Sequence, residues 1–352
     1  MRVGFYYHQV PRLPRADSNP YGAILAEGLE RLGVEVEFVD DFSDAFLYRN
    51  QGRIDVLHHH WPHHDYYDDD AAIMQQQMQA FVRYMELARE LGYRLVWTAH
   101  NIYPHNRRHQ PIDHECRLEI CRLATAVIAH CEVAADGVRE ILKRRENLFV
   151  IPHPHFIGIY PDAVTREQAR AALDVPPAAF AYGFFGGIQP YKGVEGLIES
   201  FQRLPGDDTW LLISGGNARQ PEFLDSIRRR AEKHPRIVLR AYDRAPNEDV
   251  ALIMRAADVI TLPFVDTMTS GSLILALSWG KPVIAPALGC LPTTVQPAAG
   301  RLYDPRDDDP LHKSMVEARE LDLEVASQAA LASVRQLDWD EIAAATLRAY
   351  EA

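Results

Sequence analysis

This 352-residue chain has little cysteine, no long apolar run and no excess of positive charge. The four cysteines form no CxxC pair and show no metal-ligand spacing, so they give no sign of a metal site. No stretch approaches 18 uninterrupted apolar residues, and the first residues lack the basic-then-apolar order of a signal peptide. The net charge of -12 is spread along the chain, which argues against binding to nucleic acid. We therefore expect a cytoplasmic protein that does not bind nucleic acid.

Short β-rich runs alternate with helical patterns from one end of the chain to the other. Such alternation is typical of parallel sheets wrapped by helices, and six runs in each half predict two doubly wound, Rossmann-like α/β domains. Prolines and a glycine separate the halves before a helix opens near Thr165, so we predict domains at 1–160 and 161–336. The amphipathic segment 337–352 is expected to pack back on the first domain. The predicted strands are 2–7, 34–39, 55–60, 94–99, 126–130, 148–152, 179–185, 210–214, 237–241, 259–263, 282–285 and 301–303.

The segment AYGFFGGIQPYKGVEGLIESF contains a strand that ends in Gly186 and Gly187, followed by a loop and by Lys192 at the start of a helix. A helix N-terminus offers unpaired N–H groups and the positive end of the helix dipole, and a lysine adds a full charge, so this geometry suits a diphosphate. The segment matches neither GxGxxG nor the Walker A pattern. The alternative is a strand-loop-helix turn whose glycines only permit tight packing.

A second candidate anion site follows the strand VITLPF, in the segment VDTMTSGSLILALSWGKPVIAP. Thr269 or Ser270 can cap the helix, and Gly271 lets a ligand approach the backbone closely. The amides near Gly271 and Ser272 would then face an anion. An ordinary Ser/Thr cap is the alternative, but two such helix ends in one domain favour a diphosphate site.

Histidine is concentrated in the first half, where 13 of the 15 histidines precede residue 156. The run HHHWPHHDYYDDD could gather a transition metal through His58, His60, His63, His64 and Asp65, although a polar strand-end loop is the simpler interpretation. His100 follows a strand, which favours a functional role over that of a satisfied core histidine. A further alternative concerns Arg107, Arg108 and His109, which could meet an anionic acceptor or form a solvated basic loop.

Four motifs of the second half, FGGIQPYKGVEGLIESF, WLLISGG, AADVITLPF and SGSLILALSWGKPVIAP, resemble in order the donor half of GT-B glycosyltransferases of the family-4 group. The first half agrees, because SNPYGAILAEGLERLGVEV, DVLHHHWP and VWTAHNIYPHN resemble the loops and strand ends of a bacterial branch. The resemblance covers nearly the whole chain. It implies two Rossmann-like domains that face each other across a cleft, with the acceptor held by the first and the nucleotide sugar by the second.

The resemblance also implies a set of site residues. His100 would lie beside the donor sugar and Lys192 would contact the donor phosphates, so both are predicted to be catalytic. The predicted donor-binding residues are Gly186, Gly187, Lys192, Gly215, Asp266, Thr269, Ser270, Gly271 and Ser272. The predicted acceptor-binding residues are Asn19, Tyr21, Trp61, Asn101, His105 and His155.

Two features depart from the family pattern. Relatives commonly carry an arginine after the first glycine of the phosphate loop, where this chain has Gly187. They also carry two glutamates eight residues apart, and the aligned positions here are Thr267 and Leu275. The second glutamate often holds the nucleotide ribose, so the identity of the donor is left open.

The sequence therefore predicts a glycosyltransferase that moves a sugar from a nucleotide-diphosphate sugar to a saccharide, lipid-linked saccharide or small-molecule acceptor. The resemblance favours retention at the anomeric carbon, and Lys192 with the helix N-termini would stabilise the leaving diphosphate without a metal or other cofactor. Peripheral contact with the inner membrane face is compatible with the acidic charge. The alternatives are an epimerase or phosphorylase on the same scaffold, or a catalytically silent binding subunit.

Overall fold

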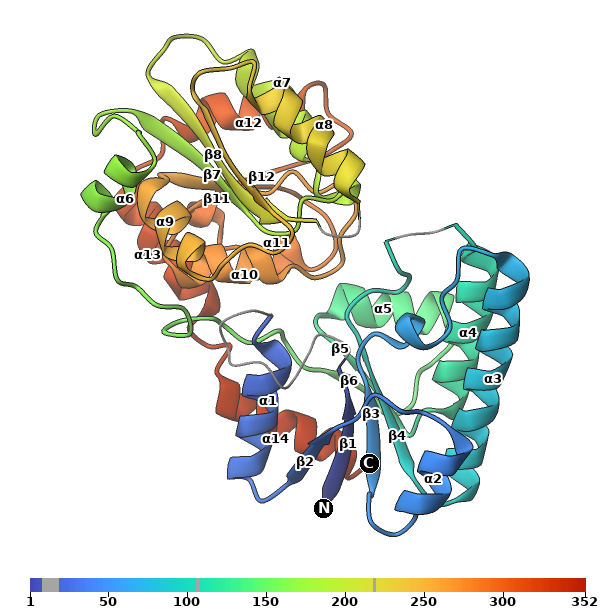
Figure 1. Ribbon diagram of the computed structural model, residues 1–352. Coiled ribbons are helices and arrows are strands. Elements are labelled where there is room, and N and C mark those ends of the chain that lie inside the picture. The colour runs from blue at the N-terminus through green and yellow to red at the C-terminus, as the bar shows by residue number, and fades with distance from the viewer. Residues whose placement is uncertain (8–18, 106–107, 218–219) are drawn as a thin grey trace. The chain divides into compact units, whose positions relative to one another are not determined.

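The computed structural model describes residues 1–7, 19–105, 108–217 and 220–352, which divide into two compact units (Figure 1). Unit 1 comprises Met1–Pro154 together with Leu337–Ala352, and unit 2 comprises His155–Gln336. Each unit contains one parallel sheet with helices packed on it, and the described residues of each sheet form six strands. The predicted pair of doubly wound α/β domains is confirmed.

The sheet of unit 1 has the strand order β2-β1-β3-β4-β5-β6, and every pairing in it is parallel. Its central strands are buried, as is usual for parallel strands with helices on both faces. The order reverses between β1 and β3, so the residues after these two strands meet at the carboxyl edge of the sheet. The strands are β1 (Arg2–Tyr6), β2 (Glu35–Phe38), β3 (Val56–His59), β4 (Arg94–Ala99), β5 (Ala126–Ala129) and β6 (Leu148–Val150).

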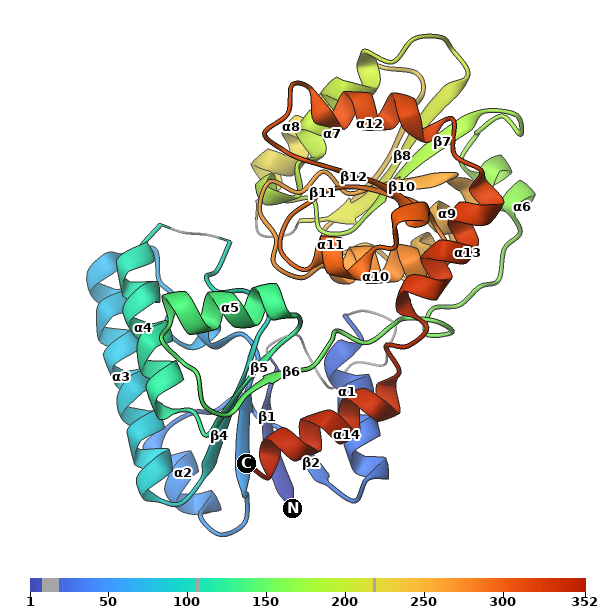
Figure 2. The same ribbon diagram turned by 180° about the vertical axis from the view of Figure 1, so that it is seen from behind.

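The helices of unit 1 cover both faces of its sheet, with α1 and α14 beside one face and α3 and α4 beside the other (Figures 1 and 2). The C-terminal helix α14 begins after Asp338, whose side chain accepts from two amides of the first turn. It packs against α1 closely enough that a Cβ on Gly28 would lie 2.9 Å from Ala343 Cβ. The elements are α1 (Tyr21–Arg31), α2 (Asp44–Asn50), η1 (Pro62–Asp65), α3 (Ala71–Glu90), α4 (Gln110–Leu123), α5 (Glu132–Ile141) and α14 (Trp339–Tyr350).

The sheet of unit 2 has the strand order β12-β11-β10-β7-β8-β9, and it is also entirely parallel. Its order reverses between β7 and β10, which places the loops after these two strands side by side. All twelve predicted strands overlap observed ones. Those of unit 2 are β7 (Phe180–Phe185), β8 (Thr209–Gly216), β9 (Ile237–Tyr242), β10 (Val259–Thr261), β11 (Val283–Pro286) and β12 (Gly300–Tyr303).

The first helix of unit 2 begins where the sequence predicts. Thr165 forms a capping box with Gln168, in which each side chain bonds to the other residue's amide. The helical elements of unit 2 are α6 (Arg166–Ala172), η2 (Pro190–Lys192), α7 (Val194–Gln202), α8 (Pro221–Ala231), α9 (Glu248–Ala256), α10 (Gly271–Ser278), α11 (Leu291–Thr294), η3 (Pro297–Ala299), α12 (Pro310–Ala318) and α13 (Leu323–Val334).

Candidate active site

The switch point of the unit 2 sheet brings together the two segments that the sequence identifies as anion-binding. The loop after β7 carries Lys192, and the loop after β10 leads into α10. The Val265 amide donates to the Tyr191 carbonyl oxygen at 2.8 Å, which ties the two loops together. A side chain on Gly193 is excluded, because its Cβ would lie 2.0 Å from the Pro263 carbonyl oxygen and its φ is +70°. The two motifs therefore belong to one site.

The Lys192 ammonium is partly buried and has no hydrogen-bond or ion-pair partner among the residues that the structure describes. It lies over two aromatic rings, 4.4 Å from the centroid of Phe264 and 5.1 Å from that of Tyr191. Burial lowers the pKa of Lys192 to about 8, because removal from water penalises the charged form. An unpaired ammonium in such a place is suited to an anionic ligand.

The N-terminus of α10 offers amides to the same site. Ser270 caps the helix, since its hydroxyl oxygen accepts from the Leu273 amide at 3.2 Å and its carbonyl oxygen accepts from the Ile274 amide. In the described part of the chain, the Gly271 and Ser272 amides have no acceptor. Ser272 also lies close to the loop after β7, because a Cβ on Gly186 would be 2.8 Å from the Ser272 hydroxyl oxygen. Two amides without an acceptor in the described structure therefore lie at the end of α10 that adjoins the loop after β7.

The glycines of this site differ in what their missing side chains permit. Gly186 has φ +149°, a conformation that other residues rarely adopt. Gly215 allows two backbones to approach, since its Cβ would lie 2.0 Å from the Gly186 carbonyl oxygen. A Cβ on Gly187 would have no neighbour closer than 3.7 Å, so this position has room for a side chain.

Asp266 and Thr269, the other predicted donor-binding residues, flank the same loop and are partly exposed. Burial raises the pKa of Tyr191 to about 12, and the nearby negative charge of Asp266 contributes to the rise. The Thr269 carbonyl oxygen accepts from the Thr267 hydroxyl at 3.3 Å. Asp266 therefore lies at the Lys192 side of the site, and Thr269 lies in the turn before α10.

Sequence reasoning missed a buried carboxylate at the carboxyl ends of β8 and β9. Asp249 accepts two hydrogen bonds from Arg240, at 2.8 and 2.9 Å, and further ones from Ser214 and Tyr242. Burial alone would raise the pKa of Asp249, but these hydrogen bonds hold it below its usual value. Ser214 and Arg240 lie near the ends of predicted strands, which identifies them as candidate site residues. Nothing in the sequence pattern indicates that they bond to Asp249.

The switch point of unit 1 is occupied by stacked histidines and aromatic rings. Trp61 stacks on His100 with ring centroids 4.5 Å apart, and Tyr21 meets the same imidazole edge-on at 5.3 Å. Tyr21 is buried and also contacts Tyr7 and Trp339. Of the predicted residues, Tyr21 and Trp61 thus both contact His100.

Three imidazoles of this cluster form a hydrogen-bonded chain. His60 Nδ1 lies 3.0 Å from His100 Nε2, and His100 Nδ1 lies 3.1 Å from His130 Nε2. His130 Nδ1 must donate, because its partner at 2.9 Å is the Ile151 carbonyl oxygen. In neutral rings, His130 Nε2 then accepts from His100 Nδ1–H, and His100 Nε2 accepts from His60 Nδ1–H. The chain ends at His60 Nε2, a buried acceptor with no partner in the described structure.

Burial keeps these imidazoles uncharged. It lowers the pKa of His130 to about 4 and those of His58 and His153 to about 3, and it holds those of His60 and His100 well below the usual value. His58 is held by Tyr350 of α14 at 2.7 Å and by Thr98 at 2.8 Å. The cluster is therefore a neutral network rather than a cationic one.

The remaining predicted acceptor-binding residues are Asn19, Asn101, His105 and His155. The Asn19 side chain accepts from the Tyr21 amide at 3.1 Å and so holds the start of α1. Asn101 and His105 are partly exposed in the loop after β4. His155 is the first residue of unit 2, and its Nδ1 accepts from the Ile157 amide.

The basic loop before α4 is partly neutralised. Arg108 forms an ion pair with Asp69 at 3.0 Å, and His109 hydrogen bonds to the Asp69 carbonyl oxygen. Arg107 lies outside the described residues. These contacts favour the interpretation of a solvated loop.

The histidine-rich run does not gather ligands for a metal. Across the described ranges, no group of three or more His, Cys, Asp or Glu side chains is placed to hold an ion. The rings of His63 and His64 in η1 lie tilted against each other with centroids 4.2 Å apart, whereas His58 bonds to Tyr350 and Thr98.

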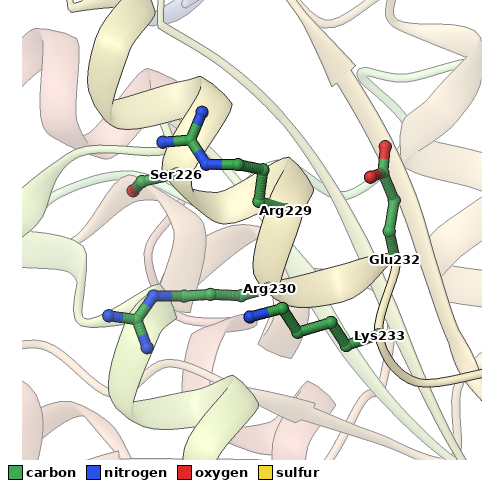
Figure 3. Close-up of a pocket in the computed structure, with 5 residues that line it drawn as sticks. All are labelled: Ser226, Arg229, Arg230, Glu232 and Lys233. Carbon is green, nitrogen blue, oxygen red and sulfur yellow. The ribbon is translucent and has the colours of Figure 1, made fainter.

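Two open hollows of unit 2 lie away from the switch point. One, of about 620 Å³, is lined by Ser226, Arg229, Arg230, Glu232 and Lys233 around the end of α8 (Figure 3). The other, of about 350 Å³, lies near Lys281 before β11. Both adjoin residues that precede strands, at the opposite edge of the sheet from Lys192, so neither is part of the site described above.

Comparison with known proteins agrees with the fold. The sequence model of the family Glycosyl transferases group 1 matches residues 179–320. The GDP-mannose:glycolipid 4-beta-D-mannosyltransferase of Xanthomonas campestris is 27% identical over 343 residues, covering 96% of this chain and 89% of that protein. Among solved structures, sucrose-phosphate synthase from Thermosynechococcus elongatus has a TM-score of 0.77 at 17% identity, with 99% and 98% of the two chains covered.

The Anabaena protein Alr3699/HepE, solved with UDP and glucose, has a TM-score of 0.72 at 18% identity and covers 100% of this chain and 99% of its own. The matched residues 179–320 contain Lys192 and the start of α10, so the family match and the candidate site coincide. Together, the group 1 match over residues 179–320, the mannosyltransferase relative and the fold of the structural neighbours support a nucleotide-sugar-dependent glycosyltransferase of the GT-B fold.

Proposed function

We propose that the chain transfers a hexosyl group from a nucleoside-diphosphate sugar to a hydroxyl of a saccharide or lipid-linked saccharide. Unit 2 binds the donor and unit 1 binds the acceptor. GDP-mannose is the leading donor candidate, because the Xanthomonas relative that matches 96% of the chain carries GDP-mannose in its name.

One observation carries the proposal for the donor. At the switch point of unit 2, an unpaired ammonium and two unpaired amides at a helix N-terminus lie on loops that are tied together. The negative charge that develops on a leaving diphosphate requires such preorganised donors. Lys192, Gly271 and Ser272 supply them, and the missing side chain of Gly186 lets Ser272 of α10 come close to the loop after β7.

The predicted binding site for the sugar acceptor offers aromatic rings and polar groups that can form hydrogen bonds. Tyr21 and Trp61 provide rings, with Asn19, Asn101, His105 and His155 as further polar groups. Both ring nitrogens of His100 are already bonded to histidines. We propose that a substrate hydroxyl takes the place of the His60 Nδ1–H at His100 Nε2, which is the atom of His100 that accepts.

We propose transfer with retention, which the resemblance to family-4 enzymes favours. We also propose transfer without a metal, since Lys192 and the α10 amides meet the diphosphate charge themselves. The Xanthomonas relative is named for a β-linked product, so the anomeric configuration must be determined on the product of this chain. NMR of that product tests retention, and the assay repeated with EDTA and with Mg²⁺ tests metal independence.

Contact with the inner membrane face is proposed through the lipid part of the acceptor. Within the described ranges, no helix combines the length and the apolar character needed to cross a bilayer. Flotation with anionic and neutral liposomes, with and without a lipid-linked saccharide, tests this proposal.

A thermal-shift series with GDP-mannose, UDP-glucose, dTDP-glucose and ADP-glucose tests the donor site. A ligand that binds only the native state raises the melting temperature, and a concentration of 100 Kd adds about 2.7 kcal/mol of stability. We expect one donor to stabilise the protein, Lys192→Met to lose most of that shift, and Lys281→Met to keep it. Lys281 is a matched control, because burial also lowers its pKa to about 8 but its ammonium donates to the Ala257 carbonyl oxygen. An undiminished shift in Lys192→Met would refute the site.

A further inference from the structure

In the described part of the structure, aromatic rings, and not a carboxylate, contact the Lys192 ammonium. The Phe264 ring centroid is 4.4 Å from Nζ, and the structure gives this ammonium no acceptor within the described ranges. Lys281 shows the usual alternative, since it donates a hydrogen bond to a backbone oxygen at 2.8 Å. Nothing negative therefore has to leave before Lys192 can bind an anion.

The Phe264 ring is itself fixed in place. Only 2% of Phe264 is exposed, and its amide donates to the Leu262 carbonyl oxygen at 2.9 Å. The next residue, Val265, bonds to Tyr191, and the missing side chain of Gly193 lets Pro263 come close. The ring and the lysine therefore belong to two loops that are joined on both sides of the contact.

A ring face suits this place better than a carboxylate. A cation over an aromatic ring is attracted by the negative face of the π system, and the attraction grows when the site is partly desolvated. A carboxylate would attract the ammonium more strongly but would also repel a diphosphate. An aliphatic side chain would bury the charge without any compensation.

We propose that Phe264 is a positioning residue that holds the Lys192 ammonium on its ring face and thereby prepares it for an entering diphosphate. This inference rests on the proposed donor site. It adds a residue that makes no contact with the diphosphate itself and acts only through Lys192.

A double-mutant cycle tests the inference with inorganic pyrophosphate as the probe. Its Kd is measured by calorimetry at pH 7 for the wild type, Phe264→Leu, Lys192→Met and the double variant. We expect Phe264→Leu to weaken binding by between about 2-fold and 30-fold when Lys192 is present, the range of cation–π contacts. We expect no further loss from Phe264→Leu when Lys192 is already methionine.

Two controls separate positioning from packing. Phe264→Tyr retains the ring, so its Kd for pyrophosphate should stay within about 2-fold of the wild-type value. This change is no larger than the smallest loss expected for Phe264→Leu. Phe264→Leu should also move the titration midpoint of Lys192, followed by NMR, to lower pH, because the charged form loses the ring. A purely structural role would not shift this midpoint.

The outcomes distinguish the inference from the proposed function. An equal loss from Phe264→Leu in both backgrounds, or no loss in either, would overturn the positioning role and leave the donor site intact. An unchanged Kd in Lys192→Met would overturn the donor site and the inference with it. Should Phe264→Leu fail to fold, the ε-methylene protons of Lys192 in the wild type decide the matter: upfield ring-current shifts support the contact, and random-coil shifts refute it.

Discussion

Lowering the pH from 8 to 5.5 should destabilise unit 1 by several kcal/mol, because it contains five buried neutral imidazoles. Burial lowers the pKa of three of these imidazoles to about 3 or 4 and holds the pKa of the other two well below the usual value. When the chain unfolds, the same side chains titrate near 6.5. Below pH 6.5 the unfolded state therefore binds protons that the native state does not. The five residues are His58, His60, His100, His130 and His153.

The size of the effect follows from proton linkage. At pH 5.5 each unfolded imidazole is about 0.9 protonated, so each native imidazole that stays neutral costs about 1.4 kcal/mol relative to pH 8. Five such groups cost about 7 kcal/mol as an upper limit, which is comparable to the whole stability of a typical domain. The full stability is present above pH 6.5 and is lost as the pH falls toward the native pKa values. Carboxylates with lowered pKa values, such as Asp304 at about 2, act in a lower pH window.

Urea unfolding, followed by circular dichroism at half-unit steps from pH 8 to pH 5.5, measures this loss. The slope of the unfolding free energy at pH 5.5 should correspond to about 4.5 protons taken up on unfolding. The variant His130→Gln should reduce that uptake by about one proton. A stability that is flat over this range, or a slope of less than one proton, would refute the neutral cluster.

The site yields further expectations that simpler measurements check. Lys192→Met should lower turnover on the true donor by a factor on the order of 10², as losses of comparable oxyanion donors do, and steady-state kinetics will show it. Affinity for GDP should fall as the pH rises through about 8, the pKa of the free Lys192 ammonium, and this dependence should vanish in Lys192→Met. Nitrogen-15 NMR at pH 7 should find the proton of His100 on Nδ1, and a proton on Nε2 would contradict the direction assigned to the imidazole chain.

Much of the fold and the position of the candidate site in unit 2 could be predicted, because both rest on local patterns. Strand-forming runs are continuous in the sequence, and Thr165 and Ser270 cap their helices through neighbouring amides. The rule that ligands bind beyond the carboxyl ends of parallel strands then selects the loops of Lys192 and Gly271.

Side-chain partnerships between distant segments could not be predicted. His60, His100 and His130 follow three different strands, and only their packed geometry shows that one imidazole bonds to the next. The same holds for Phe264 beneath Lys192 and for Asp249 among its donors. Each of these contacts depends on strand order and on side-chain direction, which hydrophobic periodicity does not specify.

The departure at Gly187 leads to a gain-of-affinity prediction. The resemblance implies that family members commonly have an arginine at this place. A Cβ here would have no atom closer than 3.7 Å, so Gly187→Arg should fold normally. The new guanidinium would belong to the residue after Gly186. It would lie in the loop that carries Lys192, near the unpaired amides of α10. A charge-assisted hydrogen bond from it to the diphosphate would tighten GDP binding by about 10-fold to 100-fold.

Three matched variants define what the gain in Gly187→Arg means. Gly187→Ala should fold and bind GDP as the wild type does, which shows that the position accepts a side chain. Gly187→Gln, which adds length without charge, should gain much less than arginine. Gly186→Ala should weaken binding or stability, because its φ of +149° is unfavourable for alanine and the added Cβ would lie 2.8 Å from the Ser272 hydroxyl oxygen. If Gly187→Arg folds and its Kd for GDP, measured by calorimetry, equals that of Gly187→Ala, the diphosphate does not lie beside this loop, and the assignment of Lys192 and the α10 amides to it is wrong.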